Sequence, residues 1–369
     1  MAKSRLHELA ARGQSVWFDT LSRELVHSGE LKRMMKDDAV TGVTSNPTIF
    51  QKALSSGEAY DADMKKLLAE TDDPTEIFFS LALQDIRDAC DTLKPAYDAS
   101  EGADGYVSME VLPSLAYDTE GTFNQVRYIA KEVERPNLMI KIPATVPGLP
   151  AIEDSIAHGT SINITLIFSL ERYKAVVEAY LRGLERLVAG GGDPSTIASV
   201  ASFFVSRVDT EADKRLEAAG NTKLQGKLAI ANAKLAYEHY LQEFSSGPRW
   251  EFLEGKGAKK QRCLWASTST KNPNYRDVIY VEELIGPETV NTMPLETIEA
   301  FQDHGEVRGD TVLEGLAEAH KLIAELANAG VDYDDVTETL EAEGVEKFAA
   351  SFDEIVESIR AKRGSLAAA

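Results

Sequence analysis

Short apolar runs recur along the chain, and each is followed by a stretch in which apolar residues return every three or four positions. The short runs are typical of buried β-strands, and the longer stretches are typical of amphipathic helices. We therefore predict eight strands, at residues 15–20, 41–46, 105–111, 138–144, 161–168, 197–207, 262–268 and 290–294. Helices are predicted between and after them, for example at 78–93, 122–134, 170–189, 224–244, 312–328 and 347–363.

This alternation predicts an α/β fold with a parallel sheet. Eight repeats favour a (β/α)8 TIM barrel that occupies residues 1–369 as a single domain, and an open doubly wound sheet is the alternative. Long segments separate the second strand from the third and the sixth from the seventh, so helical insertions are expected at about 50–103 and 208–261. The tail, about 310–369, is amphipathic and is expected to form a helical extension packed on the outside.

One predicted strand contains a lysine that its surroundings do not explain. Lys141 lies in the middle of the run LMIKIP at 138–143, where both faces of an alternating strand are largely apolar. A buried ammonium is costly unless it is paired or loses its proton. A neutral lysine is a nucleophile suited to forming an imine with a carbonyl. A structural explanation is equally open from this strand alone: the stem is buried and the ammonium reaches a carboxylate at the strand end.

Charge and composition exclude several kinds of partner. Acidic residues outnumber basic ones by 60 to 39, which gives a formal charge of −21. Such a surface repels nucleic acid and anionic lipid, so an anionic ligand needs a few cations inside a pocket. No stretch has the length of a signal peptide core or a membrane span, so we expect a cytoplasmic protein. We also expect it to be a monomer or a homodimer. Cys90 and Cys263 form no disulfide framework or CxxC motif, and the scattered histidines predict no metal site.

Polar side chains gather where the predicted strands end, which is where barrels of this type build their active sites. Each has a structural explanation: helix capping, ion pairing or a hydrogen bond in the core. Their coincidence at one end of successive strands nevertheless favours a shared site. The residues are Asp19, Thr44, Ser45, Asn46, Ser108, Glu110, Lys141, Asn163, Thr165, Ser202, Arg207, Ser267 and Lys271.

These groups suit the cleavage of a carbon–carbon bond in a sugar. Lys141 can form an imine with a ketose, and the protonated imine then accepts the electrons of the neighbouring bond. Asp19 and Glu110 can act as a base and as a group that activates water. The amides and hydroxyls can hold sugar hydroxyls, and Arg207 with Ser267 and a later cation can bind a terminal phosphate.

Five segments, in this order, resemble transaldolase: VWFDT at 16–20, GVTSNPT at 42–48, VSMEV at 107–111, MIKIPAT at 139–145 and SINITLIFS at 161–169. The resemblance extends from about residue 16 to residue 294 and is greatest to the longer, actinobacterial or plant-like branch. It implies a class I aldolase-type barrel that needs no cofactor. The implied reaction moves a dihydroxyacetone unit from sedoheptulose 7-phosphate to glyceraldehyde 3-phosphate, in the pentose phosphate pathway.

The resemblance also implies a role for each matching residue. Lys141 is the Schiff-base nucleophile, Asp19 is the acid and base for the C4 hydroxyl, and Glu110 and Thr165 hold the catalytic water. The remaining residues bind substrate or its phosphate: Thr44, Asn46, Asn163, Ser202, Phe204, Arg207 and Ser267. Many family members have an arginine two positions after the phosphate-binding serine, where this chain has Ser269; Lys271 is the nearest cation and is expected to take that role.

Two rival functions stay open at this point. A simple aldolase on the same barrel releases dihydroxyacetone instead of passing it on, but Glu110 and Phe204 resemble the transferase branch, whereas aldolases tend to carry glutamine and tyrosine there. A barrel that only binds sugar phosphates is the other rival. It has no reason to keep a costly buried lysine.

Overall fold

The computed structural model describes residues 4–55 and 58–367. Eight parallel strands form a closed barrel in which each strand pairs with the next and the first pairs with the last, so the predicted TIM barrel is confirmed. At the closure, Phe18 on β1 is in register with Met293 on β8. The strands are β1 Gln14–Phe18, β2 Val40–Thr44, β3 Val107–Glu110, β4 Leu138–Pro143, β5 Ile162–Ile167, β6 Ser199–Phe204, β7 Arg262–Ala266 and β8 Thr289–Met293.

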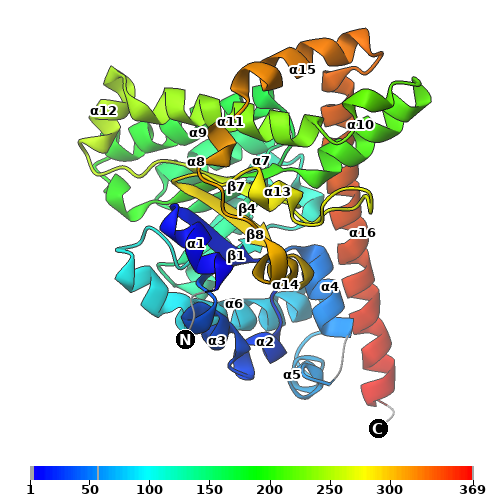
Figure 1. Cartoon of the computed structure of the whole chain (residues 1–369). Coiled ribbons are helices and arrows are strands. Elements are labelled where there is room, and N and C mark those ends of the chain that lie inside the picture. The colour runs from blue at the N-terminus through cyan, green and yellow to red at the C-terminus, as the bar shows by residue number, and fades with distance from the viewer. Residues whose placement is uncertain (1–3, 56–57, 368–369) are drawn as a thin grey trace.

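Helices surround this barrel (Figure 1). Their first turns show why they begin where they do: Asp118 accepts a hydrogen bond from Gly121 N at the start of α7, and Ser169 accepts one from Arg172 N at the start of α9. The helices before β5 are α1 Arg5–Ala11, α2 Arg23–His27, α3 Glu30–Asp37, α4 Pro47–Ser55, α5 Asp61–Leu67, α6 Pro74–Ala99, α7 Thr119–Val133 and α8 Gly148–Ala157. Those after β5 are α9 Leu170–Ala189, α10 Ser206–Ala218, α11 Leu228–Ser245, α12 Pro248–Glu254, α13 Ile279–Glu282, α14 Leu295–His304, α15 Leu316–Asn328 and α16 Tyr333–Ala367.

The long intervals between strands contain helices, with α4 to α6 between β2 and β3, and α10 to α12 between β6 and β7. The last helix, α16, is the long red helix that passes α10 and α4 along one side of the barrel in Figure 1. It contacts β5 as well as the short 3-10 turn η1 (Pro113–Leu115) after β3. The tail is helical, as expected, and α16 does more than cover the outside of the barrel, because it also reaches the end of β5.

Two strand ends depart from regular geometry. The pairing of β5 with β6 shifts register between Ile164 and Ile167, and Leu166 inside this bulge has a φ of +59°. Bulges of this kind change the direction of neighbouring side chains and occur often beside active sites. The predicted sixth strand, 197–207, was too long at its end, because α10 begins at Ser206. Arg207 therefore lies in the first turn of a helix.

Candidate active site

Lys141 lies in the middle of β4, where all six residues are buried. Register places it beside Glu110 on β3 and beside Asn163 on β5. Its side chain is buried, its Nζ donates a hydrogen bond to Ser45 O at 2.9 Å, and the same Nζ lies 3.3 Å from Glu110 Oε2. The sheet thus places the predicted nucleophile directly against a carboxylate.

Glu110 is the other half of this pair, and only 8% of its surface is exposed. Burial raises the pKa of Glu110, and the Lys141 ammonium opposes that shift in part. Oε2 accepts no hydrogen bond from any described residue. The Lys141 ammonium at 3.3 Å is the one charged group paired with this oxygen among the described residues, so Oε2 can still accept a hydrogen bond from a further donor.

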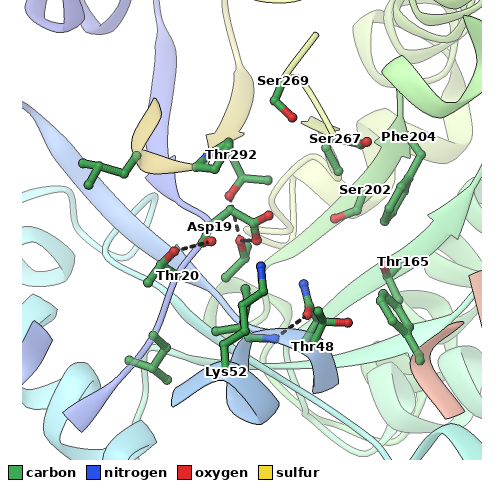
Figure 2. Close-up of a pocket in the computed structure, with 18 of the residues that line it drawn as sticks. Asp19, Thr20, Thr48, Lys52, Thr165, Ser202, Phe204, Ser267, Ser269 and Thr292 are labelled. Atoms are coloured by element: carbon green, nitrogen blue, oxygen red, sulfur yellow. Dashed lines mark hydrogen bonds between the residues drawn. The ribbon is translucent and has the colours of Figure 1, made fainter. Parts of the chain in front are cut away.

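A pocket of about 650 Å³ opens at the C-terminal ends of the strands (Figure 2). Side chains from different strands and from the loops after them point into this one space. Most of the site residues predicted from the sequence line it, namely Asp19, Thr44, Asn46, Lys141, Thr165, Ser202, Phe204, Arg207, Ser267 and Lys271. The strand-end pattern therefore located a real cavity.

Hydrogen bonds fix the polar groups on the β1, β2 and β8 side of the pocket. Thr44 Oγ1 donates to Asp19 Oδ1 at 2.7 Å and lies 2.7 Å from Thr292 Oγ1. Asn46 Oδ1 accepts from Ile49 N at 3.0 Å, so this amide also caps the start of α4. Asp19 is thereby held at the pocket wall with its second oxygen directed at no described donor.

Asn163 does not line the pocket. It is fully buried, donates to Ser108 Oγ at 3.0 Å and accepts from Ser202 Oγ at 2.6 Å. The side chain is thus a hydrogen-bonded core amide that fixes Ser202, which does line the pocket. Thr165, next to the β5 bulge, differs: its Oγ1 is buried, lines the pocket and has no hydrogen-bond partner among the described residues.

The β6 and β7 side of the pocket carries the cations. The Arg207 guanidinium lies 5.0 Å from the centre of the Phe204 ring and makes no hydrogen bond or ion pair with another described residue. Burial lowers the pKa of Arg207, while Asp19 and Glu110 act in the opposite direction. Ser267 has a φ of +56°, a conformation that non-glycine residues adopt mainly where the surrounding structure imposes it.

Lys271 is exposed and its Nζ donates to Ser269 Oγ at 2.7 Å. Both residues line the pocket, as expected if the lysine takes the place of an arginine at 269.

Several residues that line the pocket were not predicted from the sequence. Thr292 is the penultimate residue of β8, close enough to the strand end for the strand-end rule to have found it. Lys52 on α4 and Phe348 on α16 also line the pocket, and no local pattern marks either of them. Lys52 is exposed and, within the described residues, has no hydrogen-bond or ion-pair partner.

Over the same described ranges, no group of three His, Cys, Asp or Glu side chains could hold a metal ion. No described helix is long and apolar enough to cross a membrane.

The sequence matches the profile of the family described as Transaldolase/Fructose-6-phosphate aldolase over residues 16–359. The chain belongs to this family. The match runs from within β1 to α16 and so includes the other seven strands in full, which confirms the resemblance stated from five motifs.

Curated relatives of the chain bear the name "Transaldolase". A protein of Parafrankia sp. (strain EAN1pec) is 53% identical over 365 residues, which is 98% of this chain and 99% of that protein. One from Acidothermus cellulolyticus is 51% identical over 356 residues, covering 96% and 95% respectively. One from Mycolicibacterium paratuberculosis is 50% identical over 363 residues, covering 98% and 97%. These relatives confirm the expectation of a transaldolase-type transferase of the actinobacterial branch.

Proposed function

We propose that Lys141 forms a Schiff base with a ketose phosphate and that the chain transfers a dihydroxyacetone unit between sugar phosphates. The donor is sedoheptulose 7-phosphate or fructose 6-phosphate, and the acceptor is glyceraldehyde 3-phosphate or erythrose 4-phosphate, as in the pentose phosphate pathway. One observation carries this proposal. A buried lysine lines a polar pocket, with its Nζ 3.3 Å from a buried carboxylate.

The first steps build the imine. Lys141 loses a proton, for which Glu110 lies within reach, and its Nζ attacks the C2 carbonyl of the ketose. The resulting carbinolamine loses its C2 oxygen as water and becomes a protonated imine. Thr165 Oγ1 is buried and has no hydrogen-bond partner among the described residues, and the buried Glu110 Oε2 has only its ion pair with Lys141 there. A water molecule held between the two oxygens would give both a hydrogen bond. This pair supports their assignment to the catalytic water.

The next steps break and form the carbon–carbon bonds. Asp19 accepts the proton of the C4 hydroxyl, the C3–C4 electrons pass into the imine, and an aldose phosphate leaves. The enamine that remains attacks the aldehyde carbon of the acceptor, and Asp19 returns the proton to the new hydroxyl. Water then hydrolyses the imine and releases the new ketose. Asp19 lines the same pocket as Lys141, which supports this role.

The other lining residues bind the substrate. Thr44, Asn46, Ser202 and Phe204 contact the sugar chain, while Asn163 acts through Ser202. Arg207, Ser267 and Lys271 bind the phosphate. The absence of any internal anion paired with Arg207 among the described residues supports this, because its donors stay available to phosphate oxygens.

An aldolase that releases free dihydroxyacetone shares the lysine and every step up to the enamine. Glu110 and Phe204 favour the transferase, since they match the residues of that branch of the family. Measuring free dihydroxyacetone with and without an acceptor aldehyde separates the two functions: a transferase releases it at a negligible rate in both cases.

Trapping the imine tests the proposal. Fructose 6-phosphate with borohydride is expected to add a reduced three-carbon unit at Lys141, located by peptide mass mapping, and Lys141→Ala is expected to abolish it. The same sample contains two internal controls, the pocket residue Lys52 and the buried Lys234, which are expected to stay unmodified. Wild-type protein in which Lys141 stays unmodified with substrate bound would overturn the Schiff-base mechanism.

A further inference from the structure

The C-terminal helix places one stripe of residues against the barrel. Gly344, Phe348 and Phe352 recur every four positions on α16 and so lie on one face. A Cβ at Gly344 would lie 2.9 Å from Leu166 Cδ2, which shows that α16 contacts the bulge beside Thr165. Phe348 lines the main pocket. One face of α16 therefore passes from the end of β5 across the catalytic pocket.

Phe352 reaches the far side of Glu110. A small cavity of about 10 Å³, about the space one water requires, is lined by Glu110, Asn46 and Phe352 together with Phe50 and Phe78. Asn46 also lines the main pocket, so the two cavities meet at this residue. Glu110 thus faces Lys141 on one side and this small, nearly apolar cavity on the other.

Ring contacts and a hydrogen bond between helices fix the apolar wall of this small cavity. Phe78 on α6 packs edge-on against Phe50 at 5.6 Å and against Phe352 at 5.3 Å between ring centres. Next to Phe352, Ser351 Oγ lies 2.7 Å from Thr48 Oγ1 and ties α16 to α4, which lie side by side in Figure 1. Ion pairs from Arg215 to Asp335 and from Arg172 to Glu341 anchor the beginning of the helix.

We propose that Phe352 is a positioning residue of the active site, which keeps bulk water from Glu110 and leaves room behind it for a single bound water. This inference rests on the proposed function. Phe352 acts through Glu110 and touches no substrate. The charged groups that act on Glu110 are Lys141 on β4, Asp19 after β1 and Arg207 on α10, whereas α4, α6 and α16 present Phe50, Phe78 and Phe352 to it. Removing the ring therefore changes the hydration of Glu110 without changing any charge near it.

The test compares Phe352→Ala with Phe352→Leu. The alanine variant admits water to Glu110, which moves its pKa back toward the ordinary value, so the acidic limb of the kcat profile is expected to move to lower pH. The plateau kcat is expected to fall about tenfold because a more hydrated carboxylate is a weaker base, while KM changes less than about twofold. Leucine keeps most of the apolar volume and is expected to restore the wild-type profile.

Ile359→Ala is the matched control, because Ile359 is buried on α16 but lines neither cavity. It is expected to lower the stability of the protein while leaving the pH profile unchanged. An unchanged profile and kcat in Phe352→Ala, or an equal shift in Ile359→Ala, would overturn the inference. If wild-type protein is trapped at Lys141 and Phe352→Ala behaves like wild type, only this inference fails; if wild type is not trapped, the proposed function fails.

Discussion

Lys141 and Lys234 are both buried lysines, and comparing them shows how the surroundings of the proposed nucleophile differ from those of a structural lysine. Lys234 on α11 donates to Glu314 O at 3.0 Å and lies 3.4 Å from Glu283, in the packing between helices. Lys141 has a similar carbonyl and a similar carboxylate, but it also lines a 650 Å³ pocket. Burial with a carboxylate partner is thus compatible with a structural ion pair. Access to this pocket is what distinguishes Lys141.

Asp209 provides a prediction about stability at the residue scale. It is buried on α10, accepts hydrogen bonds from Ala229 N and Tyr280 OH, and burial raises its pKa to about 7. In the unfolded chain an aspartate has a pKa of about 3.9, so the folded state favours the protonated form. A raised folded pKa contributes stability that is fully present below about pH 4 and is lost as pH rises through 7.

Asp209→Asn removes this titration. We expect the free energy of unfolding of wild type to fall relative to Asp209→Asn between about pH 5 and about pH 8, by on the order of 1–3 kcal/mol. Urea unfolding at several pH values in this window measures it. Parallel curves for the two proteins would show that Asp209 does not titrate there.

At the scale of elements, α10 holds the loop that carries Lys271. Asp213 Oδ1 accepts from Gly226 N at 2.8 Å and its Oδ2 accepts from Tyr275 OH at 2.5 Å. Asp209, one turn earlier, holds Tyr280 in the same way. The insertion between β6 and β7 therefore fixes the segment after β7, which lines the pocket with Ser269 and Lys271.

Two glycines in the connection between α10 and α11 allow a matched test. Both have positive φ, +71° at Gly220 and +69° at Gly226, but only at Gly226 would a Cβ meet the Tyr275 ring, at 2.7 Å. Gly220→Ala is expected to cost about 1 kcal/mol of stability from backbone conformation alone. Gly226→Ala is expected to cost more, because the ring must also move.

Only Gly226→Ala is expected to raise KM for a phosphorylated substrate, by about threefold to tenfold, since it displaces the loop of Lys271. Urea unfolding and steady-state kinetics on both variants measure the two effects. Equal KM values in the two variants would show that Tyr275 does not position this loop.

At the scale of the whole molecule, a strongly acidic protein surrounds a locally cationic pocket. The chain carries a formal charge of −21, yet Arg207, Lys271 and Lys52 all line one cavity together with Lys141. The overall field repels polyanions, while a small anion that enters the pocket meets several donors. This distribution suits a small phosphorylated substrate better than a nucleic acid.

The thiols report on the integrity of the whole fold. Cys90 and Cys263 are both free and buried, and burial raises the pKa of both thiols, that of Cys263 to about 12. We expect neither thiol to react with a thiol reagent in the native protein and both to react in urea, at the rate of global unfolding. Rapid labelling of either cysteine under native conditions would show that its region opens locally.

The sequence by itself determined the eight strands, their parallel order and the end of the barrel at which the site lies. Alternation and helical periodicity are local, and parallel strands all end at the same rim, so Asp19, Thr44 and Lys141 were found without any knowledge of packing. The end of the sixth strand was placed wrongly, because Val205 extends the apolar pattern beyond Phe204 although the backbone turns into α10 at Ser206.

Only the tertiary structure decided what surrounds the lysine. It buried Asn163 in the core behind Ser202, left Thr165 Oγ1 without a hydrogen bond among the described residues, and brought Phe348 and Phe352 of α16 to the strand ends. None of this is local in the sequence. Contacts between segments far apart in the chain arise from the packing of whole helices, and a bulge such as that at Leu166 changes side-chain directions that regular alternation predicts.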